Sequence, residues 1–569
     1  MSRAEMTSRG WDELDVLIIT GDAYVDHPSF GAALIGRVLE AMGCRVGIAA
    51  QPDWRHVESL RAMGTPRLFV GVTAGNLDSM LSNYTAARHK RKDDTYSEGG
   101  VPGRRPNHAA VVYSQMAKRA FPGVPVVLGG VEASMRRVAQ YDYWEDKLRP
   151  SILADAKADL LVYGMGERAV REIARRLEAG RPDLGGIPGT ALLLGAKATS
   201  TMDFGDAVML PSWEELQADQ TLLMRLTKVV EAEQSPFCGK RMVQRHGSRA
   251  VVIEPPAMPV DGPDLDALYE LPFERRPHPS YAGPIPALAT VKDSIVVSRG
   301  CAGGCTYCGL GLHQGKFISS RGVESVLGEI RTLAASPTFH GTVSDLGGPT
   351  ANLYGARNGH VNACKVCRRP SCLWPAICPQ FGIDEQRGIA LLRGARAQPG
   401  VQHVFVQSGI RMDVALRTPA YFRELVRHHV SGHLKVAPEH MHPAVLRRMR
   451  RTAGDFPAFM KKFSEESAAA GKEQYLVPYF ISSFPGCTDQ EMAAVEEFLR
   501  KENWNLQQVQ DFIPLPMTVA AAMYVTGLDF DSGQPIQVAR HAGERERQKR
   551  ALRPSRAPRS RTGPLDTVD

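Results

Sequence analysis

The apolar positions of the first 200 residues fall into short runs that alternate with longer stretches of helical periodicity. Strand-like runs are expected at residues 15–20, 45–49, 67–72, 124–129 and 159–163, and helices at 29–42, 109–121 and 167–179. Short apolar strands separated by helices predict an α/β fold with a parallel, doubly wound sheet, that is, a Rossmann-like domain. Ligands of such sheets bind beyond the carboxyl ends of the strands. The residues expected there are Asp22, Asp26, His27, Gly129 and Gly130.

A second alternating pattern occupies residues 291–530. Strand-like runs are expected at 294–298, 341–346, 403–407, 434–437, 474–481 and 508–513, and helices at 321–336, 384–397, 419–430, 442–470 and 488–504. Six successive strand–helix units predict a partial (β/α)6 TIM-like barrel that is open on one side. Functional loops of such barrels follow the carboxyl ends of the strands.

A proline-rich stretch marks the boundary between the two patterns. Nine prolines lie between Pro255 and Pro286, and proline fixes φ and removes a backbone donor, so we expect an extended linker there. The predicted organisation is therefore a Rossmann-like domain at 1–200, a connecting segment at 201–290 that ends in this linker, and a barrel at 291–530. A tail follows at 531–569.

The net charge of +8 is concentrated in the tail. Nine Lys or Arg and two Asp or Glu lie between Arg540 and Thr562. This stretch has no apolar period, so we expect a disordered, solvated segment, with contact to nucleic acid as the weaker alternative. The rest of the chain is nearly neutral, which argues against a dedicated nucleic-acid binder. No apolar run is long enough to span a membrane and no signal-peptide pattern opens the chain, so we expect a cytoplasmic protein.

Three cysteines in one short loop carry the strongest chemical signal. Cys301, Cys305 and Cys308 form a C-x3-C-x2-C run rich in glycine. Iron–sulfur clusters are held by cysteine thiolates, so three local ligands leave one iron of a 4Fe–4S cube open for another ligand. A structural zinc site would need four ligands, commonly in paired C-x2–4-C units. The spacing therefore favours an open-iron cluster.

This loop resembles the signature of the radical S-adenosylmethionine (SAM) superfamily, and more narrowly the YgiQ-type family of radical SAM proteins. The resemblance covers nearly all of the chain up to about residue 530, and its further segments are 26–31, 129–134, 344–352, 437–440 and 510–516. It implies an enzyme whose 4Fe–4S cluster cleaves SAM reductively. The resulting 5′-deoxyadenosyl radical would act on an unidentified substrate, and an electron donor such as flavodoxin or ferredoxin would supply the electron. The alternative is a non-enzymatic zinc-binding module with a nucleic-acid-binding tail.

The resemblance also implies positions for the SAM-binding residues. Gly347 and Gly348 would meet the amino group of SAM. Ser408 and Arg411 would lie near the carboxylate or sulfonium end, and Glu439 near the ribose. Tyr307 would lie near the adenine, with packing beneath the cluster loop as its alternative role.

A second cysteine set lies in an insertion at residues 355–383. Cys364, Cys367, Cys372 and Cys378 give the spacing C-x2-C-x4-C-x5-C. Four thiolates suit either a second 4Fe–4S cluster or a structural zinc ion, and ligand type does not decide between them. The trailing Cys-Pro favours iron slightly. The remaining cysteines, Cys44, Cys238 and Cys487, are isolated in sequence and are expected to be small buried apolar side chains.

The N-terminal domain resembles the cobalamin-binding domain that is often joined to radical SAM barrels. The cobalamin pattern Asp-x-His-x-x-Gly is not matched, because residues 26–31 read Asp-His-Pro-Ser-Phe-Gly. This departure argues against cobalamin and against His27 as a cobalt ligand.

Overall fold

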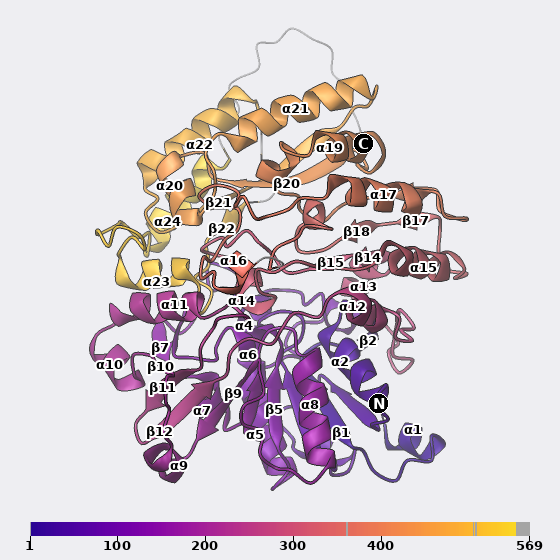
Figure 1. Ribbon diagram of the computed structural model, residues 1–569, viewed down its shortest axis with the longest axis vertical. Coiled ribbons are helices and arrows are strands. Elements are labelled where there is room, and N and C mark those ends of the chain that lie inside the picture. Colours follow the sequence, from indigo (N-terminus) through magenta and orange to yellow (C-terminus); the bar gives the residue numbers. More distant parts are fainter. Residues whose placement is uncertain (1, 360–361, 505, 507–508, 554–569) are drawn as a thin grey trace.

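The computed structural model describes residues 2–359, 362–504, 506 and 509–553. The N-terminal half of the chain forms the lower part of the molecule in Figure 1, and the barrel, coloured from rose to yellow, lies against it. The loops between the two halves therefore meet in the middle of the molecule. Both predicted α/β units are present.

The N-terminal half is built on one sheet of nine strands in the order β10-β11-β12-β9-β8-β5-β4-β1-β3. Five of its strands are mutually parallel: β1 (Val16–Thr20), β3 (Val46–Ala50), β4 (Phe69–Thr73), β5 (Val126–Gly129) and β8 (Leu160–Val162). Taken in chain order, these five strands are arranged 2-1-3-4-5, the flavodoxin-like order of a doubly wound sheet. The strand order reverses between β1 and β4, and ligands of such sheets bind at this switch point.

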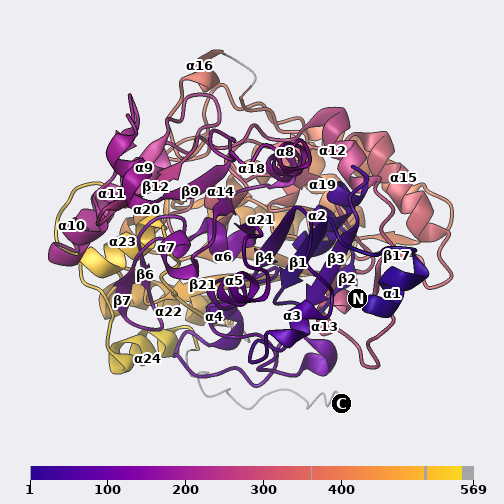
Figure 2. The ribbon, with the colours of Figure 1, turned by 90° about the horizontal axis from the view of Figure 1, so that it is seen from below.

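Helices cover both faces of the parallel strands, as the alternation of side chains in β1 shows. Val16 and Ile18 pack in a cluster with buried residues of α2 (Gly31–Glu40) and α8 (Glu167–Glu178). Leu17 and Ile19 point to the other face and pack with α5 (Ala109–Ala120) and α7 (Ile152–Ala156). Figure 2 views this domain from below. A strand buried on both faces explains why its sequence is continuously apolar.

The sheet extends beyond the predicted domain boundary at residue 200. Strands β9 (Thr190–Leu194) and β12 (Arg249–Ile253) continue it in antiparallel fashion, followed by β11 (Met242–His246) and β10 (Val208–Met209). The segment from 201 to 253 is thus part of the N-terminal domain. Smaller elements complete this half: α1 (Arg3–Ser8), β2 (Val25–Asp26), α3 (Glu58–Arg61), α4 (Ser79–Asn83), α6 (Gly130–Ser134), β6 (Gln140–Asp142), β7 (Lys147–Arg149), α9 (Ala196–Thr201), α10 (Trp213–Ala218) and α11 (Leu222–Ala232).

The proline-rich stretch is only partly an extended linker. It contains α12 (Gly262–Tyr269), which buries Leu265, Leu268 and Tyr269 against the α2–α8 side of the sheet. Proline is tolerated in the first turn of a helix, where the backbone amides have no intrahelical acceptor. Further along, β13 (Arg276–Pro277) pairs with β2, and α13 (Pro286–Val291) leads into the barrel.

The barrel strands pair in parallel but in separate short ladders. β14 (Ser294–Val296) pairs with β18 (Asp345–Gly347), and β17 (Thr342–Val343) pairs with β19 (His403–Val404). β20 (His433–Glu439), β21 (Tyr475–Ser482) and β22 (Gln510–Asp511) form a third parallel group. The helices that follow the strands are α15 (Val323–Ala334), α17 (Glu385–Arg396), α19 (Pro419–His428), α20 (Pro443–Met449), α21 (Asp455–Ala469) and α22 (Asp489–Lys501). The partial six-strand barrel is therefore confirmed.

Two sequence-based predictions in this half were wrong. The helix expected at 442–470 is two helices, α20 and α21, because Arg450 and Gly454 adopt positive φ angles between them. The tail is not disordered throughout, since α24 (Ala542–Ala551) lies within it; the helix α23 (Val519–Thr526) precedes the tail. The Gln548 side chain donates to Cys487 O at 2.8 Å, and Arg545 donates to Phe512 O at 2.6 Å. Residues 554–569 of the predicted tail lie outside the described residues.

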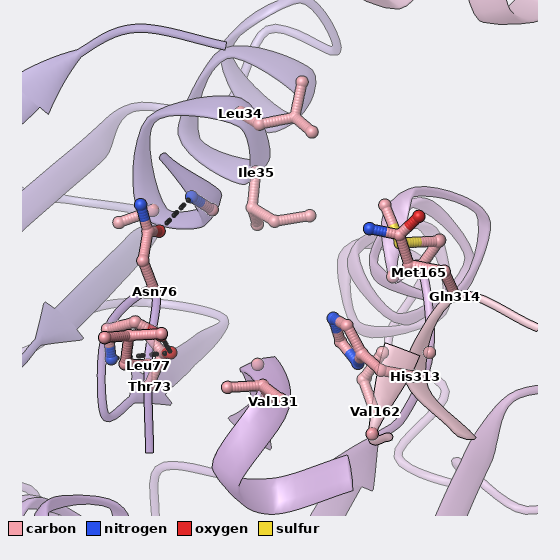
Figure 3. A pocket seen from close by; sticks show the side chains of 18 of the residues that line it. Leu34, Ile35, Thr73, Asn76, Leu77, Val131, Val162, Met165, His313 and Gln314 are labelled. Carbon is pink, nitrogen blue, oxygen red and sulfur yellow. Dashed lines mark hydrogen bonds between the residues drawn. The ribbon is translucent and has the colours of Figure 1, made fainter. Parts of the chain in front are cut away.

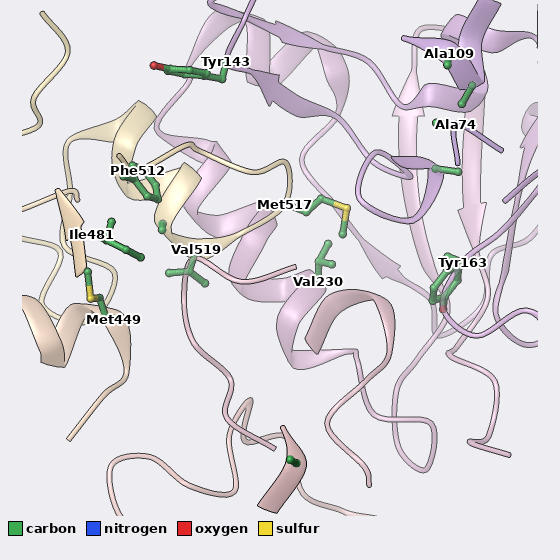
Figure 4. Close-up of a cluster of buried hydrophobic side chains, with 14 of the residues drawn as sticks. Ala74, Ala109, Tyr143, Tyr163, Val230, Met449, Ile481, Phe512, Met517 and Val519 are labelled. Carbon is green, nitrogen blue, oxygen red and sulfur yellow. The ribbon is translucent and has the colours of Figure 1, made fainter. Parts of the chain in front are cut away.

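One hydrophobic core spans both halves. Figure 4 shows part of it, where Tyr143 and Tyr163 of the N-terminal half belong to the same cluster as Met449 and Ile481 of the barrel. This shared core fixes the sheet and the barrel against each other. Among the described residues, no helix has both the length and the apolar character required to cross a membrane.

Candidate functional site

The loop with the three cysteines follows β15 (Ser298–Arg299) and depends on two tightly packed glycines. Gly300 has φ 84°, and a Cβ there would lie 2.0 Å from Phe317 O. Gly304 has φ 61°, and a Cβ there would lie 2.7 Å from Pro370 O. Both positions combine positive φ with a backbone contact that only glycine permits. They fix the curvature that brings the cysteines together.

Cys301, Cys305 and Cys308 line one cavity of about 70 Å³ at the mouth of the barrel. Thr350 Oγ1 lies 3.8 Å from Cys301 Sγ, and Arg411 Nη1 donates toward Cys305 Sγ at 3.7 Å. Burial raises the pKa of the Cys308 thiol to about 12, so binding of a metal would release a proton from it. The predicted ligand set is thus assembled beside a guanidinium, which suits an anionic cluster.

The residues expected to hold the amino-acid end of SAM lie side by side. Ser408 donates both its hydroxyl and its backbone amide to the carboxylate of Asp345. A Cβ on Gly347 would lie 2.1 Å from Ser408 Oγ, and one on Gly348 would lie 2.7 Å from Ser298 O. The glycine pair therefore lets the ends of three strands approach closely. Arg411 completes the group, held through an ion pair with Asp413.

Tyr307 and Glu439, predicted near the adenine and ribose, contact each other. The Tyr307 hydroxyl donates to Glu439 Oε1 at 2.7 Å, and Arg451 Nη2 donates to the same oxygen at 2.9 Å. The Tyr307 ring also packs edge-on against Phe484. The structure thus brings all six predicted SAM-site residues to one end of the barrel, while their individual roles toward SAM stay predictions.

Arg299, next to the cysteine loop, connects the loop to the N-terminal domain. Its Nη1 donates to Glu167 Oε1 of α8 at 2.6 Å, and its Nε donates to Tyr269 Oη of α12 at 3.0 Å. Both ionic partners are buried, with Arg299 6% and Glu167 1% exposed. The arginine is therefore neutralised by a carboxylate and serves as a tether between the two halves.

The second cysteine set packs directly against the first loop. The Cys372 amide donates to Ala302 O at 3.0 Å, and the Ser371 hydroxyl donates to Gly303 O at 2.8 Å. Cys367 lines the same 70 Å³ cavity as the three cysteines of the first loop. The two sets are therefore neighbours in space, although 56 positions separate Cys308 from Cys364.

Sequence reasoning missed several groups around the second set. Lys316 donates to Cys367 O at 3.2 Å and lies 3.8 Å from Cys367 Sγ. The Asn358 amide lies 3.5 Å from Cys372 Sγ. Cys238, expected to be isolated, has its sulfur 3.9 Å from Cys367 O. No local pattern could reveal this, because Cys238 and Cys367 are 129 positions apart.

The described cysteines do not form a preassembled site for a single metal ion. A zinc–sulfur bond of about 2.3 Å places four tetrahedral thiolates about 3.8 Å apart. In the described part of the chain, the group of three or more ligand atoms that all lie within 4.8 Å of one another is His108, Asp142 and Glu145, with none among the cysteines. In that group, Arg149 Nη1 lies 3.1 Å from His108 Nε2 and already supplies a cation.

A large cavity of about 820 Å³ joins the switch point of the sheet to the cysteine loop. On the sheet side its wall contains Thr73 of β4, Gly129 at the carboxyl end of β5 and Ile35 of α2. On the barrel side its wall contains Tyr307, Cys308 and Gly348, together with Pro349, Leu515 and Pro516. Figure 3 shows Leu34 and Ile35 facing Met165 and His313 across this space. Cavities of this size and apolar character accommodate large organic ligands.

His313 is a neutral base on the wall of this cavity. Burial lowers its pKa to about 4. Ser134 Oγ donates to Gly130 O and accepts from the Gly164 amide, so its contact with His313 Nδ1 at 3.0 Å requires the ring nitrogen to donate. Nε2 is then left as the acceptor nitrogen.

The other residues expected at the sheet edge are not on this wall. His27 Nδ1 accepts from the Ser29 amide, and Arg275 Nη1 lies 3.1 Å from Nε2, so both ring nitrogens are occupied. Asp26 is ion-paired with Arg37 and Asp22 with Arg105. The polar atoms of His27, Asp22 and Asp26 are therefore engaged within the protein.

Comparison with known proteins shows which family this chain belongs to. Residues 1–294 match the family model described as "Radical SAM N-terminal". A UPF0313 protein of Geobacter sulfurreducens is 49% identical over 572 residues, covering 100% of this chain and 94% of the relative. A UPF0313 protein of Bradyrhizobium diazoefficiens is 46% identical, covering 95% of this chain and 83% of the relative. The predicted relationship to radical SAM proteins is confirmed.

A solved structure shares the fold across most of the chain. The radical SAM methyltransferase TsrM from Kitasatospora setae, solved with cobalamin and a [4Fe-4S] cluster bound, superposes with a TM-score of 0.52 at 15% identity. The match covers 94% of this chain and 84% of TsrM. The combination of a doubly wound sheet with a partial barrel is thus common to both chains.

Proposed function

The chain belongs to the UPF0313 family, within the radical SAM superfamily, and from this we propose that it is a radical SAM enzyme. In this proposal Cys301, Cys305 and Cys308 hold a 4Fe–4S cluster whose fourth iron binds SAM. When bound, the cluster would supply the electron that splits SAM into methionine and a 5′-deoxyadenosyl radical. The radical would remove a hydrogen atom from a substrate in the large cavity.

One observation carries the proposal: Cys308 lies on the walls of both cavities. The small cavity gathers the three thiols, and the large cavity extends from the same residue toward the sheet. A radical formed at the cluster would therefore open onto an apolar space of about 820 Å³ that can hold a second molecule. An apolar wall also protects a reactive radical from water.

The surrounding residues would orient the cofactor without changing its chemistry. Arg411, beside Cys305, is placed to neutralise either a thiolate or the SAM carboxylate. Glu439 is held by Tyr307 and Arg451 at the end of β20, where its carboxylate would accept hydrogen bonds from the ribose hydroxyls. These roles follow from the resemblance and from the proximity of the groups.

The test is SAM cleavage by protein purified without oxygen. With dithionite as reductant, we expect 5′-deoxyadenosine and methionine in equal amounts, and about four irons to be lost in a Cys305→Ser variant. Cys44→Ser, which changes a cysteine in a separate cluster near α2, is the matched control. If the wild-type chain binds zinc but no iron and forms no 5′-deoxyadenosine, the non-enzymatic metal-binding module becomes the better account.

A second candidate function is group transfer that uses a corrinoid in the large cavity. The cavity lies at the switch point of the sheet and reaches the cluster loop, and the TsrM structure of the same fold was solved with cobalamin bound. The cavity fits such a group in its size and its apolar lining, and His313 offers a neutral nitrogen on its wall. When bound, a corrinoid would carry a methyl group; His27 would not contribute, since its nitrogens are occupied.

Hydroxocobalamin titration distinguishes the two candidates. Binding of one corrinoid per chain would change the visible spectrum, and His313→Ala would alter the spectrum of the complex if the His313 nitrogen contacts the metal. An unchanged spectrum in the presence of the intact 4Fe–4S protein would mean that no corrinoid binds and that the cavity holds only the substrate.

A further inference from the structure

The insertion that carries the second cysteine set has an unusual charge. Residues 355–383 contain four basic residues (Arg357, Lys365, Arg368 and Arg369) and no Asp or Glu. Three of these four lie within five positions around Cys367. A local excess of one charge at the surface attracts partners of the opposite charge and speeds their association.

The basic residues lie on a part of the molecule that projects outward. Figure 2 shows α16 (Asn362–Lys365) at the outer edge of the molecule, beyond the helices that surround it. Lys365, Arg368 and Arg369 are exposed, although Arg368 is ion-paired with Glu233, and Val366 is 74% exposed. An exposed apolar side chain beside the cations of Lys365 and Arg369 on a projecting loop is suited to docking an acidic protein.

The inner side of the same insertion reaches the first cysteine loop. Cys372 N donates to Ala302 O at 3.0 Å, so a single hydrogen bond connects the residue after Cys301 to a member of the second set. Cys367 shares the 70 Å³ cavity with Cys301, Cys305 and Cys308. The insertion therefore spans from the solvent to the catalytic loop.

Lys316 supplies a second, independent indication of an anionic group at the second set. It is 9% exposed and, in the described part of the chain, forms no ion pair with an Asp or Glu. Its ammonium contacts two carbonyl oxygens, of Cys367 and Arg369, and the Cys367 sulfur. A buried cation without a carboxylate is costly unless another anion is near. Thiolates bound to a metal centre would provide that anion.

We propose that Cys364, Cys367, Cys372 and Cys378 hold a second 4Fe–4S cluster that relays single electrons to the first, and that the basic surface around Val366 docks an acidic one-electron carrier protein. This inference rests on the proposed radical SAM function. The reduced carrier loses one electron and the second cluster gains it. The second cluster then returns to its oxidised state as the first is reduced, and that electron cleaves SAM. No atom is transferred in the relay.

The closing experiment compares two reductants on the same variants. Dithionite is small and can reach the first cluster through the large cavity, which Cys308 lines. A reduced ferredoxin or flavodoxin instead has to dock. In a Cys364→Ser/Cys367→Ser variant we expect the iron content to fall from about eight to about four per chain. Formation of 5′-deoxyadenosine should then continue with dithionite but fall roughly tenfold or more with the protein donor.

A charge variant tests the docking surface without touching a cysteine. Lys365→Glu/Arg369→Glu should keep about eight irons and full activity with dithionite. Its rate with the protein donor should be lower roughly tenfold, and that rate should lose the salt dependence of the wild type. Cys238→Ser is the neighbouring control, since its sulfur faces a carbonyl and four other thiols complete the cluster.

Each alternative outcome contradicts a stated part of the proposal. About four irons with one zinc in the wild type would make the second set structural. Equal loss of activity with both reductants in the cysteine variant would exclude the relay, and iron loss in Cys238→Ser would exclude the four-ligand assignment. If the wild type forms no 5′-deoxyadenosine with either reductant while still holding about eight irons, the radical function fails although the second cluster stands.

Discussion

The Tyr307 hydroxyl donates a hydrogen bond of 2.7 Å to Glu439 Oε1 and so joins the cysteine loop to the carboxyl end of β20. Glu439 sits at φ 67°, a conformation that non-glycine residues adopt only when their surroundings hold them there. Arg451 donates to the same carboxylate oxygen at 2.9 Å. Burial raises the pKa of Tyr307 well above its ordinary value, so this hydroxyl stays protonated and donates. The contact holds Glu439 in place at the mouth of the barrel.

Replacing each partner separates the effect on stability from the effect on SAM binding. Glu439→Gln leaves the Arg451 guanidinium without its carboxylate and should destabilise the fold by about 3–5 kcal/mol. Tyr307→Phe removes one hydrogen bond to a charged group and should cost about 1.5–3 kcal/mol. Thermal unfolding and the dissociation constant for SAM should be measured together. If Glu439 contacts the ribose, only Glu439→Gln weakens SAM binding beyond what the lower stability explains; equal weakening in both variants would contradict that role.

The buried pair Arg299–Glu167 should be essential for the contact between the two halves. The pair is separated by 2.6 Å and both side chains are almost fully buried. Arg299→Ala should destabilise the protein by about 3–5 kcal/mol, because it leaves an uncompensated carboxylate. The exposed pair Arg168–Asp264, which joins α8 to α12, is a matched control. Arg168→Ala should change stability by less than about 1 kcal/mol. Similar losses of stability in the two variants would show that burial does not determine how much an ion pair contributes at this interface.

Stability should fall as the pH drops below about 6.5. Burial lowers the pKa of five histidines to about 3 or 4, namely His27, His246, His313, His429 and His440. Between pH 4 and 6.5 the unfolded chain therefore binds more protons at these sites than the folded protein does. Each such histidine costs about 1.4 kcal/mol of stability per pH unit in that window. Asp22 and Asp455, whose pKa values are raised to about 6 by burial, act in the opposite direction but are fewer.

The measurement is the thermal midpoint of the anaerobically purified protein between pH 5 and 8. We expect a plateau above pH 7 and a steady decline below pH 6.5. His246 stacks on Trp213 and both its ring nitrogens lack a partner among the described residues. His246→Phe should therefore reduce the slope below pH 6.5 while leaving the plateau in place. A midpoint that rises on acidification would contradict the assignment of neutral buried histidines.

The fold was predictable where local pattern and tertiary environment agree. Each parallel strand is a short apolar run because both its faces are covered, and the C-x3-C-x2-C loop carries all three proposed cluster ligands within eight positions. The helix α12 escaped prediction because prolines around it outweighed the helical spacing of Leu265 and Leu268. The helix α24 escaped because its buried side chains, Arg545 and Gln548, are polar and are satisfied by distant backbone groups.

The site was predictable only as far as its motifs are local. The residues of the SAM pattern were identified one by one, but the partners that hold them come from far along the chain. Glu167 reaches Arg299 across 132 positions, and Arg451 was not singled out although it shares Glu439 with Tyr307. Cavities likewise have no sequence signature, because their walls are assembled from many short segments. The apolar space between sheet and barrel became apparent only from the structure.

The apolar space between the sheet and the barrel should bind apolar molecules. Ile35 of α2 lies on its wall opposite His313 (Figure 3), so a bulkier side chain at this position would fill part of the cavity. Ile35→Trp should weaken binding of the apolar dye 1-anilinonaphthalene-8-sulfonate roughly tenfold, a loss of about 1.4 kcal/mol. Iron content and dithionite-driven cleavage of SAM without substrate should be unchanged, because Ile35 is on the sheet side. Met42→Trp, just beyond the same helix at an exposed position, is the control and should leave dye binding intact. Unaltered dye binding in Ile35→Trp would mean that the cavity is not the site where apolar molecules enter the protein.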